Sequence, residues 1–356
     1  MKSFKSLSCL FVVLGLLVFM TGCPKTAKKA QPQGMVYYNF FDTVSYIYSY
    51  AGDTPEEFEA NCEKASGVLE NYHRLFDIYY EYSGINNLCT VNKNAGGEAV
   101  KVDEELINFL LYAKQMYETT DGEMNVMMGS VLKLWHDCRT EAGENPQNAR
   151  IPTEEQLHEA AKHTSLFALE IDVAAQTVRI ADPAAAIDVG ALGKGYATEK
   201  AAMCLRDSGV DSYVLNIGGN ICTIGTKLDG TGWATGIKDP ADPERFTLTI
   251  DIADTSCVTS GDYERYFSVD GKRYHHIIDK DTWMPAEFFS AITVITPDSG
   301  LADALSTALF TMSYEDGAAL VEKIGGVEVL WITHDGTQYR TEGFSKLSPQ
   351  DISPNS

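Results

Sequence analysis

The chain is short of positive charge and lacks the common cysteine motifs. It has 28 Lys and Arg residues against 50 Asp and Glu, which gives a formal net charge of −22. A nucleic-acid binder needs a basic face to neutralise phosphates, and nothing here supplies one, so that function class is excluded. No CxxC pair is present, so neither a zinc site nor a redox motif is indicated. No internal repeat or low-complexity tract is visible.

Six cysteines follow the N-terminal segment, and their surroundings favour buried free thiols. Two lie on the apolar faces of helical patterns and two lie in strand-like runs, where a thiol packs as a small apolar group. Disulfides are the alternative, because an exported chain can form them. The six are Cys62, Cys89, Cys138, Cys204, Cys222 and Cys257.

The N-terminus has the pattern of a bacterial lipoprotein signal. Lys2 and Lys5 precede the unbroken run of small and apolar residues from Cys9 to Met20. That run is shorter than the roughly 20 residues of a membrane-spanning helix, but it suits the apolar core of a secretory signal. It ends at Met20–Cys23, which resembles a lipobox and predicts lipidation of Cys23. The alternative is an ordinary signal peptide in which Cys23 is incidental.

These features predict the domain organisation. Residues 1–22 are the signal peptide, 23–34 a tether, 35–347 the folded domain and 348–356 a C-terminal tail. Removal of 1–22 takes away two lysines and no acid, so the mature chain has a charge near −24. Several lipid chains on one cysteine anchor firmly. We therefore expect a protein that is anchored by lipid to the extracytoplasmic face of the cell membrane.

The remaining pattern predicts a mixed α and β chain. Capping boxes predict helix starts at Thr54–Glu57 and Thr153–Gln156. From Leu166 onward most segments are strand-like, with helices after Lys194 and near Asp298. The expected fold class is α+β, with a mixed, largely antiparallel sheet and flanking helices, in one large domain of two joined lobes.

The first segment with chemical interest is Ile187–Ala197. Three glycines within six positions precede a helix and allow the backbone to approach a ligand closely. Lys194 places a positive charge near the helix start, where phosphate binds well. The segment is neither a Walker loop nor a GxGxxG turn, and a purely structural turn is the alternative.

Two further segments carry weaker patterns. Asn216–Asn220 ends an apolar strand with paired glycines, which is typical of a bulge or simply a turn. Thr259–Arg265 is followed by His275 and His276 on a strand. Adjacent strand residues point to opposite faces, so at most one histidine faces a given site. Either could be a base, although a lone strand histidine is more often structural.

A fourth segment, Pro297–Thr307, suggests a cation site. Asp303 and Thr307 are four residues apart on a predicted helix, so a carboxylate and a hydroxyl share one face. Mg²⁺ takes oxygen ligands of this kind and often adds substrate phosphates. Alternatively, Asp303 only favours the positive end of the helix.

Taken in order, these segments resemble the ApbE family of FAD:protein FMN transferases. The family pattern contains D-x-G-x-x-x-K-G-Y-A, N-x-G-G, T-S-G-D-Y-E-R, H-H-I-I-D and A-D-A-L-x-T-A-L, and the resemblance spans about Tyr37 to Leu347. This chain has the matching residues at Asp188–Ala197, Asn216–Gly219, Thr259–Arg265, His275–Asp279 and Ala302–Leu309. Five ordered motifs are far more specific than any one of them. The resemblance implies an ApbE, T-fold-like architecture.

The resemblance also implies a set of site residues. The backbone carbonyl of Ala191, the carboxylate of Asp303 and the hydroxyl of Thr307 correspond to Mg²⁺ ligands. FAD contacts correspond to Phe41, Tyr79, Glu123, Met124, Asn125, Asp188, Lys194 and Ile277. Our candidate for the catalytic base is His276, with an aspartate near the metal as the rival.

This chain departs from the family pattern at three places. Phe41–Thr43 stands where the family often has Met-Gly-Thr. Asn125 stands where many members have Asp. Thr282–Pro285 contains Trp283 where a Thr-Gly-x-Pro turn is common.

The implied activity is a Mg²⁺-dependent transfer of FMN from FAD to a Thr or Ser hydroxyl of a client protein, with release of AMP. The expected client is an exported or membrane redox subunit. Two alternatives remain open from the sequence: a metal-dependent FAD pyrophosphatase that yields FMN and AMP, and a flavin-binding lipoprotein without catalysis.

Overall fold

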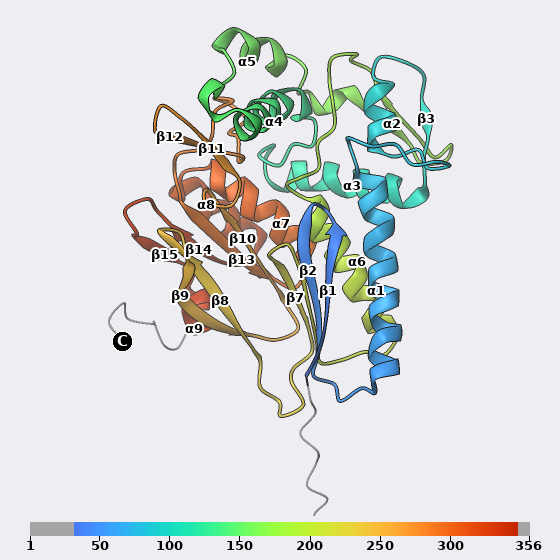
Figure 1. Ribbon diagram of the computed structural model, residues 1–356, viewed down its shortest axis with the longest axis vertical. Coiled ribbons are helices and arrows are strands. Elements are labelled where there is room, and N and C mark those ends of the chain that lie inside the picture. Colours follow the sequence, from blue (N-terminus) through green and yellow to red (C-terminus); the bar gives the residue numbers. More distant parts are fainter. Residues whose placement is uncertain (1–31, 348–356) are drawn as a thin grey trace, which may run out of the picture.

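The computed structural model describes residues 32–347, and at its centre eight strands form an antiparallel sheet (Figure 1). The strand order is β1-β2-β6-β7-β10-β13-β14-β15, and every neighbouring pair is antiparallel. The bounds are Gln33–Phe40 (β1), Thr43–Ser49 (β2), Tyr213–Ile217 (β6), Asn220–Ile224 (β7), Ser256–Gly261 (β10), Ala291–Thr296 (β13), Glu328–Ile332 (β14) and Gln338–Arg340 (β15).

Helices cover one face of this sheet. They are α1 (Pro55–Phe76), α6 (Gly193–Asp207), α7 (Ser299–Ala308) and α8 (Tyr314–Ile324). Ile47 and Leu215 face α1 and α6 within one apolar cluster, whereas Val294 and Trp331 face α7 and α8 within another. Figure 1 shows α1 and α6 beside the β1–β2 hairpin.

The opposite face is covered in part by the hairpin of β8 (Trp233–Asp239) and β9 (Asp242–Ile252) and by α9 (Glu342–Leu347). Leu248, Leu330 and Phe344 are buried in this second layer of the core. The central strands are thus covered on both faces, which explains why all six residues of β13 are buried.

The other elements form a lobe above one end of the sheet. It contains a three-stranded sheet of order β3-β5-β4, the β11–β12 hairpin, and helices α2 to α5 (Figure 1). A separate apolar cluster around Trp135 and Phe267 joins α4 and α5 to β11. The bounds are β3 Val100–Lys101, β4 Leu169–Asp172, β5 Thr177–Ile180, β11 Tyr266–Val269, β12 Lys272–His275, α2 Leu88–Lys93, α3 Glu104–Thr119, α4 Gly129–Glu144 and α5 Glu154–Ala161, with 3-10 turns at Pro146–Asn148, Leu166–Ala168 and Leu309–Thr311.

The predicted fold class is confirmed: helices flank an antiparallel sheet within one domain. Both capping boxes are present, with Thr54 and Thr153 each accepting a hydrogen bond from the third residue of its helix. The aromatic segment 36–50 contributes two strands, since Phe41 and Asp42 form a turn between them.

The six cysteines predicted to be free thiols are free, and five of them are buried. Within residues 32–347 no helix is long and apolar enough to cross a membrane. The predicted signal peptide, the lipidation site Cys23 and the tail 348–356 lie outside the described residues and stay predictions. β1 begins at Gln33, two residues before the predicted start of the domain.

Candidate functional site

One cavity of about 1480 Å³ lies where the sheet, the helical layer and the upper lobe meet. Its size exceeds the 300–1,000 Å³ usual for small-molecule sites. The structure brings together all twelve site residues that were predicted within residues 32–347. The residues that line the cavity include Phe41, Tyr79, Glu123, Met124, Asn125, Asp188, Ala191, Lys194, His276, Ile277, Asp303 and Thr307. Their individual roles stay predictions.

The glycine-rich segment before α6 is fixed from outside the cavity. The side-chain amide of Asn92 forms two hydrogen bonds with the backbone of Ile187: it donates to the Ile187 carbonyl and accepts from the Ile187 N–H. The Asp188 backbone N–H donates to the Val126 carbonyl at 2.8 Å, and its carboxylate accepts from the Gly190 N–H at 2.9 Å. Burial raises the pKa of the Asp188 carboxyl. The segment is therefore a rigid wall of the cavity.

Asp303 joins the start of α6 to α7. Its Oδ2 accepts from the Gly195 N–H at 2.8 Å, and its Oδ1 lies 3.7 Å from Lys194 Nζ. A Cβ at Gly195 would lie 2.3 Å from the Ser299 carbonyl oxygen and 2.4 Å from Asp303 Cβ. Only glycine allows the two helices to approach this closely.

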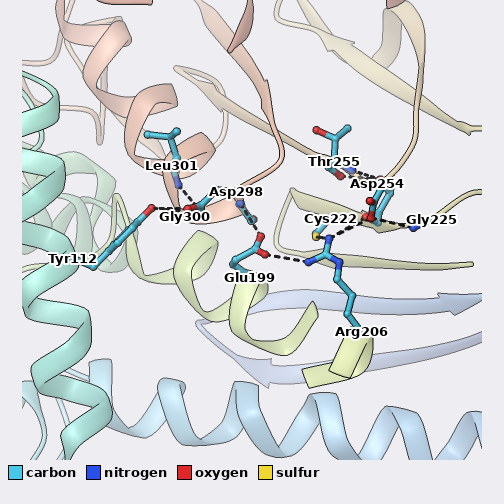
Figure 2. A network of polar contacts seen from close by, with 12 residues as sticks. Tyr112, Glu199, Arg206, Cys222, Gly225, Asp254, Thr255, Asp298, Gly300 and Leu301 are labelled. Atoms are coloured by element: carbon cyan, nitrogen blue, oxygen red, sulfur yellow. Dashed lines mark hydrogen bonds and ion pairs between the residues drawn. The ribbon is translucent and has the colours of Figure 1, made fainter. Parts of the chain in front are cut away.

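A polar network fixes α7 against α6 from the other side (Figure 2). Asp298 caps α7 by accepting from the Gly300 and Leu301 N–H groups. Glu199 of α6 accepts from the Ser299 N–H at 2.9 Å and pairs with Arg206 at 3.1 Å. Arg206 also lies 3.7 Å from Asp254, so the network extends to the loop before β10. The cavity-lining Asp303 thus stands on a helix whose start is held firmly.

The donor set at this wall suits a hard cation. The Asp303 carboxylate and the Thr307 hydroxyl share one face of α7, and Ala191 adds a carbonyl from the glycine-rich segment. Within residues 32–347 no group of three His, Cys, Asp or Glu residues could hold a metal ion. The set therefore fits Mg²⁺ only together with oxygen ligands that a substrate brings, and phosphate is the natural source.

His276 and His275 face different surroundings, as predicted. His275 Nε2 lies 2.9 Å from the Ala286 carbonyl, away from the cavity. His276 lines the cavity, and its buried Nδ1 has no protein partner. Burial, together with the nearby cations Arg265 and Arg139, lowers the pKa of His276 to about 3. The imidazole is therefore neutral near pH 7 in the ligand-free protein.

Aromatic side chains also line the cavity. The Tyr79 hydroxyl lies 3.3 Å from His136 Nδ1, with ring centroids 5.1 Å apart. Burial raises the pKa of Tyr79 to about 12. Phe41 packs edge-on against His73 at 5.7 Å, and it adopts a φ of 51°. A left-handed conformation is uncommon for a bulky residue, so the turn that carries Phe41 is strained.

Two predicted contact residues already bind the protein through their side chains. Glu123 accepts from the Thr311 hydroxyl at 3.0 Å and pairs with Lys280 at 3.3 Å. Asn125 donates to the Thr164 carbonyl at 2.8 Å and accepts from the Met127 N–H at 2.9 Å. The backbone of the turn 123–125 is thus shaped by these side chains.

Sequence reasoning gave no role to several basic cavity residues, among them His136, Arg139 and Arg265. His136 and Arg139 lie on α4, outside every motif, and only the packing of the upper lobe reveals them. Arg265 closes the segment Thr259–Arg265, so its motif was visible although no role followed from it.

Comparisons with known proteins agree with this geometry. A family model described as the ApbE family matches residues 42–331. An FAD:protein FMN transferase of Treponema pallidum is 30% identical and covers 82% of each chain. One of Escherichia coli (strain K12) is 30% identical over 81% of this chain and 80% of that protein. An ApbE protein of Thermotoga maritima superposes with a TM-score of 0.78 at 29% identity, over 90% of this chain and all of that one. A flavin transferase ApbE of Vibrio cholerae gives 0.74 at 25%, over 89% and 99%.

Proposed function

The chain belongs to the ApbE family, and we infer that it is an FAD:protein FMN transferase. The observation that carries this inference is the single cavity that collects all twelve predicted residues. It places oxygen donors, a lysine and a neutral histidine around space for more than one small molecule. A reaction between a dinucleotide and a protein side chain needs such room.

We further propose that the enzyme depends on Mg²⁺. Ala191, Asp303 and Thr307 would hold the ion, with FAD phosphates completing its ligands. A bound Mg²⁺ supplies positive charge that stabilises a phosphoryl-transfer transition state. This proposal also accounts for how an anionic cofactor binds to a chain of net charge −22.

The protein side chains have separate tasks in the proposed reaction. Lys194 supplies positive charge at the start of α6, beside the diphosphate. His276 accepts the proton of the client hydroxyl, for which its neutral state is required. The hydroxyl oxygen of a client Thr or Ser forms a bond to the FMN phosphorus. The bond from that phosphorus to the bridging oxygen breaks, and AMP leaves with the bonding electrons.

The first residues of the chain support a proposal about where the enzyme is located. Lipidation at Cys23 would place the folded domain on the extracytoplasmic face of the cell membrane. The predicted tether, residues 23–34, would connect the lipid to the folded domain. An exported or membrane redox subunit is then the natural client.

One assay separates the possible activities. The full chain is incubated with FAD, Mg²⁺ and a peptide that carries a threonine flavinylation motif. Fluorescent peptide plus AMP is the expected result. Free FMN and AMP without labelled peptide would indicate a pyrophosphatase, and unchanged FAD would indicate a carrier. Either of the last two outcomes overturns the proposed transferase.

A further inference from the structure

Two arginines at the cavity form no salt bridge within residues 32–347. Arg139 projects from α4 and Arg265 follows β10, and both line the cavity. Neither forms an ion pair with an acidic residue among residues 32–347. In contrast, the cavity residues Lys194 and Lys238 lie near Asp303 and Glu264, at 3.7 and 3.0 Å. Unpaired guanidinium groups are unexpected in a chain with 50 acidic and 28 basic residues.

The surroundings of Arg139 disfavour its charge in the free protein. Among residues 32–347 the one hydrogen-bond partner of its guanidinium is the neutral acceptor His136 Nδ1, at 3.1 Å from Nη2. Burial and the neighbouring Arg265 lower the pKa of Arg139 more than the nearby Tyr79 and Asp188 raise it. A guanidinium held close to another cation, with no carboxylate at salt-bridge distance, is stabilised when an anion enters. The two arginines thus have the properties of an anion site that only a ligand completes.

The position of the pair relative to His276 identifies which anion it suits. Arg265 and His276 lie at the same end of the β11–β12 hairpin, because the residues next to them, Tyr266 and His275, are directly paired. Arg139 lines the same cavity. They come from the upper lobe and the end of β10, whereas Asp303 and Thr307 come from α7. The arginines are therefore near the group that accepts the client's proton. The phosphorus that the client attacks must lie beside that same group.

We propose that Arg139 and Arg265 bind the FMN-side phosphate of FAD, which is the phosphoryl group that is transferred. Guanidinium groups bind phosphate oxygens through paired hydrogen bonds, which fixes orientation as well as charge. In the transfer step they hold the two non-bridging oxygens while the client oxygen bonds to phosphorus and the bridging bond breaks. The proton goes to His276 and the electron pair leaves with AMP. This inference rests on the proposed transferase function.

Binding of flavin fragments tests the assignment without any turnover. Riboflavin carries no phosphate, FMN carries the phosphate in question, and AMP carries the other one. For Arg139→Gln and Arg265→Gln we expect FMN affinity to fall by about tenfold or more, as for loss of a charged hydrogen bond. Riboflavin and AMP affinities should stay within about twofold. The FMN affinity of Arg265→Lys should lie between those of the wild type and Arg265→Gln, since lysine keeps the charge but loses the paired donors.

A matched control is Arg150→Gln. Arg150 is exposed, pairs with Glu141 and does not line the cavity, so its FMN affinity should equal that of the wild type. Unchanged FMN affinity in both cavity variants would overturn the proposal, and so would an equal loss of riboflavin affinity. A selective loss of AMP affinity would assign the arginines to the adenylate phosphate instead, which also overturns it.

Different experimental results would refute the arginine assignment and the proposed transferase function. If the wild type binds FMN through these arginines but never labels a peptide, the transferase function fails alone. If labelling proceeds in both variants with wild-type KM for FAD and wild-type kcat, the arginine assignment fails alone.

Discussion

At the residue scale, Asp303 serves two purposes with one carboxylate. Its Oδ2 accepts from the Gly195 N–H, and the whole group faces the proposed cation site. Asn at this position keeps an acceptor for Gly195 but loses the negative charge. We expect Asp303→Asn to remain folded and to lose at least about 100-fold in peptide labelling, equivalent to about 2.7 kcal/mol.

Labelling rate against Mg²⁺ concentration is the measurement for Asp303→Asn, with thermal unfolding as the control for folding. Turnover equal to that of the wild type at the same Mg²⁺ concentration would refute the metal assignment.

His276 should also make the stability of the ligand-free protein depend on pH. Its pKa is about 3 in the folded state, against the usual value near 6.5 for an unfolded chain. Between these values the unfolded chain binds a proton that the folded one excludes. The free energy of unfolding should therefore fall as the pH drops from about 6.5 toward 3. His275, whose pKa burial also lowers, acts in the same direction.

His276→Asn removes the titratable imidazole. The free energy of unfolding of this variant should therefore depend less on pH. Urea unfolding at pH 7 and pH 5 for both proteins measures the difference. Buried acids such as Asp188, whose pKa is raised, act in the opposite sense, but they are common to both proteins. Parallel losses of stability in the two proteins would contradict the predicted titration.

Trp283 adopts a backbone conformation that usually favours glycine. It replaces a glycine that is common in the related pattern, yet it keeps a positive φ of 59°. Packing in the upper lobe offsets the strain, since the Trp283 carbonyl accepts from Trp135 Nε1 at 2.9 Å and its ring meets His158 at 4.7 Å. Sequence comparison located the exception, but only the tertiary contacts explain why it is tolerated.

At the element scale, the approach of α6 to α7 depends on a missing side chain. Gly195→Ala would force the helices apart, because its Cβ would meet backbone and Asp303 atoms closer than 2.5 Å. We expect a loss of about 1–3 kcal/mol in the free energy of unfolding, together with weaker Mg²⁺-dependent labelling. Chemical denaturation and the labelling assay measure the two effects.

Gly67→Ala is the matched control. Gly67 lies inside α1, and a Cβ there would meet nothing within 4 Å. Alanine is the better helix former, so this variant should gain up to about 1 kcal/mol. Equal responses of Gly195→Ala and Gly67→Ala would show that helix propensity, not close packing, decides both.

Glu199 tests how the start of α7 is held (Figure 2). Glu199→Ala removes the acceptor for the Ser299 N–H and leaves Arg206 without its half-buried partner. We expect a loss of about 3 kcal/mol in the free energy of unfolding. Glu199→Gln keeps an acceptor and should lose less. Urea denaturation compares them, and equal losses would mean that only the charge matters.

At the scale of the whole molecule, five of the six thiols within residues 32–347 are part of the core. Burial raises the pKa of Cys62 and Cys222 to about 11 and that of Cys257 to about 12. Because the thiolate is the reactive form, native protein should react slowly at these sites. Cys204 is half-buried and should supply the fast reaction, which Cys204→Ser should abolish.

Thiol titration with an aromatic disulfide reagent, before and after unfolding, measures these differences. Reducing agent should leave the Tm unchanged, since the cysteines within residues 32–347 form no disulfide. A lower Tm under reduction, or a second fast thiol that survives Cys204→Ser, would contradict the buried-thiol prediction.

The sequence by itself indicated most of the elements, the fold class and the twelve predicted residues that line the cavity. Helix caps, periodic apolar residues and ordered motifs each span only a few neighbouring residues, so they can be recognised in the sequence alone. The tertiary structure alone decided which groups meet: Gly195 contacts Asp303 across 108 positions, and Glu123 contacts Thr311 across 188. Likewise, the low pKa of His276 and the unpaired Arg139 and Arg265 depend on burial and on charges from separate elements. Such quantities arise only when distant segments pack together.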